Sequence, residues 1–133
     1  MKYLIDTDIA SYFLRGKYNL SDIFDIKGVT EIRLSVITVA QMEVLAYKNP
    51  YSKINLATIS KLTDCLGALD LNRETWNIFS MMKAETEKQG RPRGDLDVLQ
   101  AAIAKQFGLI LITHNVDHFE GLIEYEDWAN YKN

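Results

Sequence analysis

Short apolar runs alternate along this chain with segments in which apolar residues recur every three or four positions. Runs of the first kind predict strands, and spacing of the second kind predicts helices. The expected strands cover residues 2–5, 33–36, 68–71, 109–112 and 123–126. The expected helices cover residues 9–14, 20–24, 38–47, 53–66, 73–89 and 95–107. Because strands and helices alternate, we expect an α/β fold with a mostly parallel sheet of about four to five strands flanked by helices.

Several predicted helix ends carry residues with known terminal preferences. Asp8 can cap the first helix and Asn72 the fifth, since both side chains accept hydrogen bonds from free backbone N–H groups. Gly16, Gly90 and Gly108 mark the ends of three predicted helices. Glycine readily adopts the left-handed conformation that commonly ends a helix, so these boundaries are well marked.

Size and composition predict one globular domain over residues 1–133, with 47% hydrophobic and 25% charged residues. The net charge of −3 argues against a strongly basic nucleic-acid scaffold but leaves room for a local basic patch. Cys65 is the only cysteine, so no intrachain disulfide can form and a reducing cytoplasm is expected. The first residues do not resemble a signal peptide, and no apolar run approaches the roughly 20 residues of a membrane span.

Polar side chains follow two of the predicted buried strands. Asp6 comes directly after the first strand, and residues 113–115 come directly after "LILI". In open α/β sheets, sites lie at the carboxyl ends of the strands, so these groups are expected to share one crevice. The acidic candidates in or near it are Asp6, Asp8, Glu43, Asp95, Asp97 and Asp117.

Clustered carboxylates repel one another and need a cation or a proton near neutral pH. Oxygen ligands without cysteine or histidine clusters suit Mg²⁺ or Mn²⁺, and such ions favour phosphodiester hydrolysis. Asp95 and Asp97 also have a purely structural interpretation, because they open a helix where negative charge is favourable. Asp6 is the hardest to explain in this way, since an acid beside a buried strand is unfavourable unless its oxygens are satisfied.

Four segments of the chain resemble motifs of PIN-domain ribonucleases, and specifically of VapC-type toxins from toxin–antitoxin modules. The segments are "YLIDTDI", "LSVITVAQMEVLAY", "ETEKQGRPRGDLDVLQAAIA" and "GLILITHNVDHFEGLIEYEDW". They occur in the family's order and span nearly the whole chain. The resemblance implies a PIN-like three-layer fold and a four-acid pocket. This pocket would bind Mg²⁺ or Mn²⁺ and use a metal-activated water to cut RNA.

Transferred by motif, the family's first acid falls on Asp6 and its third on Asp97, with Asp95 as an additional candidate. The second acid often lies three positions after the threonine of the strand-to-helix turn, which here is Gln41. Anchoring on "MEVLAY" instead gives Glu43, the only acid of the two, and we take Glu43 as the second catalytic acid.

The family's fourth position is commonly Asp or Asn, and here it is Asn115. An asparagine can be a weak ligand but brings no charge, so Asp117 is a possible substitute. For the RNA, "GRPRGD" supplies Arg91 and Arg93 as possible phosphate contacts. His114 is a further candidate contact to RNA.

The resemblance also implies a cognate antitoxin as protein partner and a homodimer, with no membrane association and a cytoplasmic location. Two other functions stay open from the residues alone. "DTDI" resembles the nucleophile motif of haloacid-dehalogenase-type phosphotransferases, in which Asp6 would be phosphorylated. The departures at Gln41 and Asn115 are also compatible with a module that binds RNA or protein without cutting it.

Overall fold

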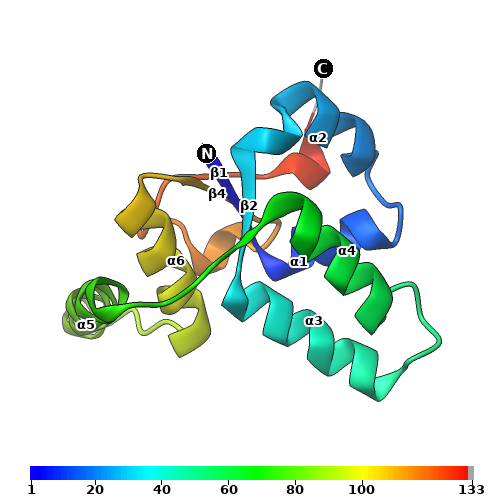
Figure 1. Cartoon of the computed structure of the whole chain (residues 1–133). Helices are drawn as coiled ribbons and strands as arrows, with labels where there is room; N and C mark the ends of the chain where they lie inside the picture. Colours follow the sequence, from blue (N-terminus) through cyan, green and yellow to red (C-terminus); the bar gives the residue numbers. More distant parts are fainter. Residues whose placement is uncertain (132–133) are drawn as a thin grey trace.

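A computed structural model describes residues 1–131 and contains a five-stranded sheet in the order β3-β2-β1-β4-β5. The strands are β1 (Tyr3–Ile5), β2 (Ile32–Ser35), β3 (Ala68–Leu69), β4 (Ile110–Ile112) and β5 (Tyr125–Glu126). Every pairing among these strands is parallel, so their carboxyl ends lie at one edge of the sheet (Figure 1). The expected α/β fold is therefore confirmed.

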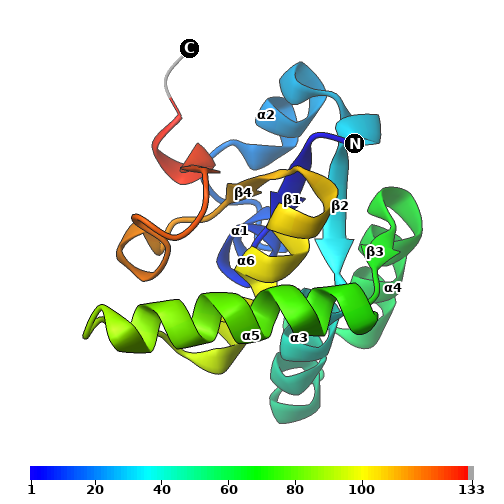
Figure 2. The ribbon, with the colours of Figure 1, turned by 90° about the vertical axis from the view of Figure 1, so that its left-hand side faces the viewer.

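Helices cover both faces of the sheet, which makes three layers (Figures 1 and 2). The helices are α1 (Thr7–Leu14), α2 (Leu20–Lys27), α3 (Val36–Lys48), α4 (Leu56–Leu66), α5 (Arg73–Lys88) and α6 (Asp95–Phe107). Short 3₁₀ turns lie at η1 (Val29–Glu31), η2 (Val116–His118) and η3 (Trp128–Asn130). Helices α5 and α6 cover one face, while α1 to α4 gather on the other (Figure 1). No helix within residues 1–131 is both long enough and apolar enough to cross a membrane.

The side chains of the central strands alternate between the two layers of helices. In β1, Tyr3 and Ile5 join the core beneath α1 to α4, and Leu4 joins the core beneath α6. In β4, Ile112 and Leu111 divide in the same way. A sheet that is buried on both faces explains why these strands are apolar at successive positions.

Most helix ends lie within a few residues of the expected positions, and the first helix shows the main difference. Asp6, not Asp8, is the N-cap of α1, because its Oδ1 accepts a hydrogen bond from the Thr7 backbone N–H at 2.9 Å. The helix thus begins before Ile9, the first apolar residue of the pattern. Its first turn exposes polar side chains to the carboxyl edge of the sheet, which an apolar periodicity cannot reveal.

Side-chain capping fixes three other helix starts. Ser35 caps α3, so β2 ends one residue earlier than expected, and Asn55 caps α4, which therefore starts three residues later than expected. Asn72 caps α5 as predicted, and Asn55 and Asn72 each form a capping box with the threonine three residues on. Reciprocal caps of this kind satisfy two free N–H groups at once.

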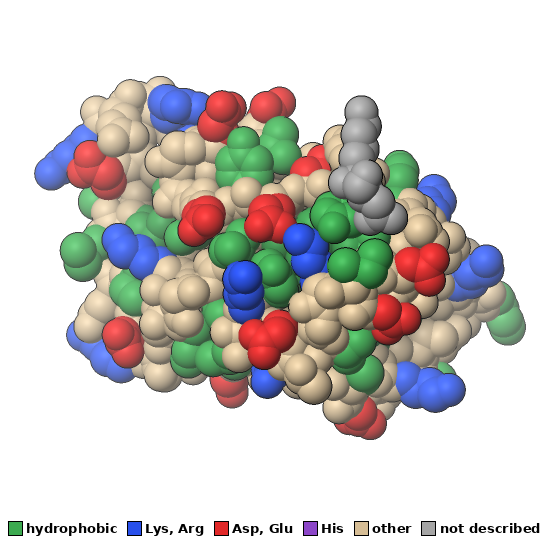
Figure 3. Space-filling view, turned by 90° about the horizontal axis from the view of Figure 1, so that it is seen from above, with side chains coloured by type: hydrophobic (Ala, Val, Ile, Leu, Met, Phe, Trp, Pro, Cys, Tyr) green, Lys and Arg blue, Asp and Glu red, His purple; other side chains and the backbone are tan. Residues whose placement is uncertain are grey.

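The edge of the sheet formed by the amino ends of the strands has a mixed surface. Figure 3 views the molecule from this side and shows acidic and basic side chains interspersed among apolar ones. Charges of both signs largely cancel at a distance, whereas a patch of one sign attracts a charged ligand. Asp6 lies at the opposite edge, where the strands have their carboxyl ends.

Candidate functional site

Asp6 lies at the end of β1 and is 8% exposed. Its Oδ1 accepts hydrogen bonds from the Thr7 N–H at 2.9 Å and from Gln100 Nε2 at 3.1 Å. Its Oδ2 accepts a hydrogen bond from Thr113 Oγ1, directly after β4, at 2.9 Å. Three donors thus compensate for the burial of this carboxylate, which explains how an acid can lie beside a buried strand.

Gln100 connects Asp6 to the end of β2. The Gln100 Oε1 accepts a hydrogen bond from Ser35 Oγ at 2.5 Å. Its Nε2 donates to Asp6 and also to Thr38 Oγ1, at 2.8 Å. Both the oxygen and the nitrogen of the amide form hydrogen bonds, and Gln100 is itself buried. Helix α6 therefore holds Asp6 in one orientation.

The same network reaches Gln41 on α3 through Thr7. The Thr7 hydroxyl donates a hydrogen bond to Gln41 Oε1 and lies 3.2 Å from the Thr38 hydroxyl. Gln41 therefore contacts Thr7, the residue after Asp6, and stands in the position where the family motif often has an acid.

The structure does not bring Glu43 to this site. Glu43 lines a separate groove between α3 and α4, together with Val39 and Thr63. Residues two apart on a helix point in widely different directions, so Gln41 and Glu43 cannot face the same crevice. The choice of Glu43 as the second acid of the site is thereby corrected.

Asp8 has a role that the sequence analysis missed. Its Oδ1 accepts from the Ile9 N–H at 2.8 Å, while its Oδ2 accepts from the backbone N–H groups of His114 at 2.9 Å and Asn115 at 3.1 Å. Asp8 therefore ties the turn after β4 to α1. Burial, with the neighbouring Asp6 carboxylate as the second cause, raises the pKa of Asp8 from 3.8 to about 6. No local signal could have shown this, because the two partners lie more than a hundred positions away.

Asp97 lies one turn before Gln100 on α6, and residues three apart share one face of a helix. Burial raises the pKa of Asp97. The His118 side chain lies 3.1 Å away and lowers this pKa, whereas the charge of Asp6 raises it. Asp6 thus acts electrostatically on both Asp8 and Asp97, and the three carboxylates form one interacting group.

The remaining acidic candidates and Asn115 lie around this group. Asp95 points into solvent, with 72% of its side chain exposed, and pairs with Lys83 at 3.0 Å. Asp117 lines an open groove of about 560 Å³ that Asp97 also lines. Asn115 is exposed and reaches the network through its backbone N–H, which donates to Asp8 and to Thr113.

The basic candidates divide into one available side chain and two that already have protein partners. Arg91 is exposed and lines the groove beside Asp97. The Arg93 guanidinium donates to the backbone carbonyls of His118 at 2.6 Å and Glu120 at 2.7 Å, so it anchors the η2 turn. His114 Nδ1 lies 2.9 Å from Asp127 Oδ2.

The donor atoms at this edge suit a hard divalent cation. Among residues 1–131, no three His, Cys, Asp and Glu side chains gather closely enough to form a complete metal site. Mg²⁺, however, commonly uses only one or two protein carboxylates and completes its shell with water and substrate phosphate. Asp6 and Asp97 fit that requirement, because Asp97 lies one turn before Gln100 on α6 and the Gln100 side chain donates to Asp6.

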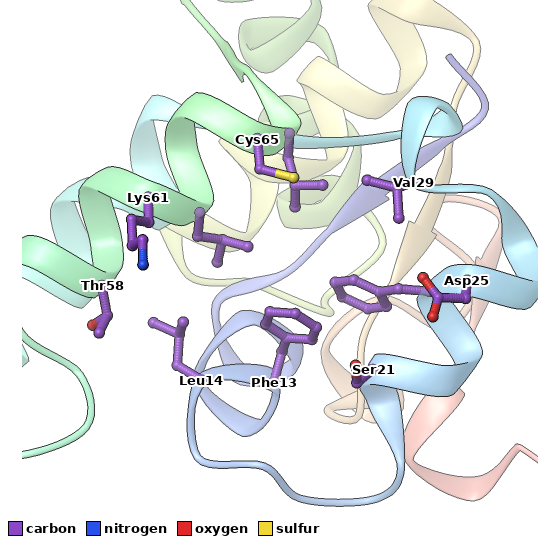
Figure 4. Close-up of a pocket in the computed structure, with 11 residues that line it drawn as sticks. Phe13, Leu14, Ser21, Asp25, Val29, Thr58, Lys61 and Cys65 are labelled. Carbon is purple, nitrogen blue, oxygen red and sulfur yellow. The ribbon is translucent and has the colours of Figure 1, made fainter.

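A second hollow lies between α1, α2 and α4 and has a different character. Its volume is about 280 Å³, and its walls are mainly apolar, with Phe13, Leu14 and Val29 among them (Figure 4). Lys61 and Asp25 add one charge of each sign. An apolar hollow of this kind suits an apolar side chain of a protein partner better than a phosphate.

Comparisons with known proteins agree with this arrangement. Residues 3–122 match the model of the PIN domain family. The chain is 33% identical over 132 residues to "Ribonuclease VapC2" of Haemophilus influenzae, covering 97% of this chain and 99% of the relative. It is 28% identical over 133 residues to "tRNA(fMet)-specific endonuclease VapC" of Shigella flexneri, with the same coverage of each chain.

A solved structure shares the fold closely. The protein in the crystal structure of DNA-bound VapBC from Salmonella typhimurium superposes with a TM-score of 0.88 at 25% identity, over 96% of this chain and 98% of that one. These comparisons support the ribonuclease interpretation. They give no support to a haloacid-dehalogenase-type phosphotransferase. The chain belongs to the PIN domain family and, within it, to the VapC proteins.

Proposed function

We propose that this chain is an endoribonuclease and the toxin of a toxin–antitoxin pair, as the names of its relatives indicate for them. The observation that carries the proposal is the buried Asp6 at the carboxyl edge of a parallel sheet, held by Gln100 of α6 and by Thr113 after β4. Asp97 lies one turn before Gln100, and Asp8 is bound to the turn after β4. Carboxylates kept together at mutual electrostatic cost are typical of sites that bind a cation and a phosphate.

Asp6 and Asp97 are the residues that we propose to hold Mg²⁺ or Mn²⁺, with Asn115 or Asp117 completing the site on the opposite turn. When bound, such an ion neutralises phosphate charge and lowers the pKa of a coordinated water. Gln100 and Thr113 hold Asp6 in place through the hydrogen bonds described above. Asp8 fixes the turn that carries Asn115, so the two sides of the crevice keep their spacing.

Charged side chains around the crevice would orient the RNA. Arg91 is exposed and free to contact a phosphate beside Asp97, whereas Arg93 acts indirectly by anchoring the η2 turn. This division replaces the expectation that both arginines contact RNA directly.

The test is cleavage of total cellular RNA by the purified protein with Mn²⁺ or with EDTA, followed by mapping of the new RNA ends. Asp6→Asn and Asp97→Asn are expected to reduce cleavage by at least about a hundredfold, because each removes a charged ligand. Asp22→Asn, which changes an exposed aspartate of α2, is the matched control and should cut like the parent. RNA binding without any cleavage would instead support the non-catalytic module.

We further propose that the apolar hollow of Figure 4 receives an apolar segment of the antitoxin. Cys65 lines it and is exposed, so Cys65→Arg should block the hollow while Cys65→Ser leaves it open. Co-purification of the co-expressed cognate antitoxin is expected to fall only for Cys65→Arg. Equal recovery with both variants would place the antitoxin elsewhere.

A homodimer and a cytoplasmic location complete the proposal. On α3, Val44 and Tyr47 are exposed apolar side chains, which suit contact with a second copy. Sedimentation at micromolar concentration is expected to show a dimer, and Tyr47→Asp should shift it toward monomer. The exposed Cys65 thiol is compatible with the reducing cytoplasm, where cellular RNA is also found.

A further inference from the structure

Three aromatic rings meet beside the carboxylate group, and we name Tyr12, Tyr18 and His114 the aromatic cluster. The ring centroids of Tyr12 and Tyr18 lie 4.9 Å apart at 68°. The His114 ring lies 5.9 Å from that of Tyr12 and 6.1 Å from that of Tyr18. The backbone N–H of His114 donates to Asp8, so the cluster adjoins the proposed site directly.

The His114 ring is held in a fixed orientation. Its Nδ1 lies 2.9 Å from Asp127 Oδ2. Asp127 is itself held, since it accepts hydrogen bonds from Asn130 Nδ2 at 2.8 Å and from the Ala129 N–H at 3.0 Å. An aromatic ring that is already ordered loses little freedom when a ligand packs on it.

Tyr18 has a backbone conformation that is unusual for tyrosine. Its φ is +58°, and that of Asn19 is +56°, so both lie in the left-handed region. Asparagine tolerates this region, but a bulky residue such as tyrosine rarely adopts it. Tyr18 nevertheless remains 48% exposed. The loop therefore presents an aromatic ring to solvent at a conformational cost, and such strain concentrates at functional sites.

We infer that the aromatic cluster is a base-binding subsite, in which an unpaired RNA base next to the cut phosphate stacks on the Tyr18 ring. This inference rests on the proposed ribonuclease activity. Recognition of single-stranded RNA commonly uses bases stacked on tyrosine or histidine rings. The cluster comes from α1, the loop after it and the turn after β4, whereas the exposed Arg91 comes from the α5–α6 loop and lines a groove that no residue of the cluster lines. One RNA strand could then use the arginine for a phosphate and the cluster for a base.

The test uses a fluorescein-labelled single-stranded RNA that spans the mapped cut, bound to protein carrying Asp97→Asn so that it stays intact. In that background, Tyr18→Gly is expected to weaken binding by about tenfold, the usual effect of losing one stacked base. Tyr18→Phe keeps the ring and should bind like the parent. Tyr51→Gly removes a tyrosine that is 97% exposed in another loop and serves as the control.

Two further measurements separate stacking from a structural role. Glycine is favoured at a positive φ, so Tyr18→Gly should not lower the melting temperature. RNAs with one abasic nucleotide at each position near the cut should include one for which Tyr18→Gly makes no further difference, because the stacked base is already missing. Equal binding by Tyr18→Gly and the parent, or an equal loss with every abasic RNA, would overturn the subsite. If the unmodified protein cuts no RNA, the proposed function fails first.

Discussion

Replacing Asp8 by asparagine should change how the stability of this protein depends on pH. The pKa of Asp8 is raised from 3.8 to about 6, first by burial and then by Asp6. Because the folded pKa exceeds the unfolded one, the folded state binds the proton more tightly. The stabilisation that protonation provides is complete below about pH 3.8 and is lost as the pH rises through about 6.

The magnitude follows from the two pKa values. A tenfold change in proton affinity corresponds to about 1.36 kcal/mol, so ionisation of Asp8 in the folded state costs about 3 kcal/mol. Asp8→Asn removes this cost but also weakens the hydrogen bonds from the His114 and Asn115 N–H groups. That loss is of order 1–3 kcal/mol. These hydrogen bonds favour the ionised carboxylate, so their pH-dependent part is already contained in the raised pKa of Asp8. The change with pH in the difference between the two stability curves therefore measures the titration of Asp8.

The assay is urea unfolding of both proteins at closely spaced pH values from 4 to 8. The free energy of unfolding of the parent, relative to Asp8→Asn, should fall by about 2 kcal/mol from pH 4 to pH 8, since the rest of the change lies below pH 4. Asp22→Asn controls for the loss of one exposed negative charge. Parallel curves for the parent and Asp8→Asn would refute the idea that Asp8 is held ionised at a cost near neutral pH.

Four other substitutions test which residues belong to the network around Asp6. Gln100→Leu should lower the free energy of unfolding by about 1–3 kcal/mol and also reduce RNA cleavage, because buried partners including Asp6 lose their hydrogen bonds; urea unfolding and a cleavage assay measure the two effects, and unchanged values would contradict the buried network. Gln41→Glu and Asn115→Asp should each tighten Mn²⁺ binding in calorimetric titration, since each adds a carboxylate at the crevice, and an unchanged affinity would show that the position does not face the ion. Glu43→Gln should leave RNA cleavage unchanged, because Glu43 lines another groove; a large loss would return it to the site.

The order and type of the elements were predictable from local pattern alone. Helix α6 has the predicted bounds, and α5 begins directly after Asn72 as expected. Both helices carry their apolar spacing and their end signals within a few neighbouring residues, and such short-range preferences act before any long-range contact forms. Asp6 was also predictable as an unusual residue, because an acid beside a buried strand needs hydrogen bonds whatever the fold around it.

The identity of the residues around Asp6 depended on the tertiary structure. Two alignments of one motif left Gln41 and Glu43 open, and only the packing of α3 against α1 shows that Gln41 meets Thr7. The sequence preference for an acid pointed the other way, since side-chain chemistry says nothing about which face of a helix turns toward a neighbour.

Long-range hydrogen bonds decided the roles of Asp8 and Arg93. The residues next to Asp8 in the sequence suggest a helix cap, yet its Oδ2 accepts a hydrogen bond from the turn after β4. Arg93 resembles a free loop cation, yet two backbone carbonyls of the η2 region hold it. By itself, the sequence determined the alternation of strands and helices, because that pattern depends on neighbours along the chain. The partners of each polar side chain were decided by the tertiary structure, because burial and hydrogen bonding depend on neighbours in space.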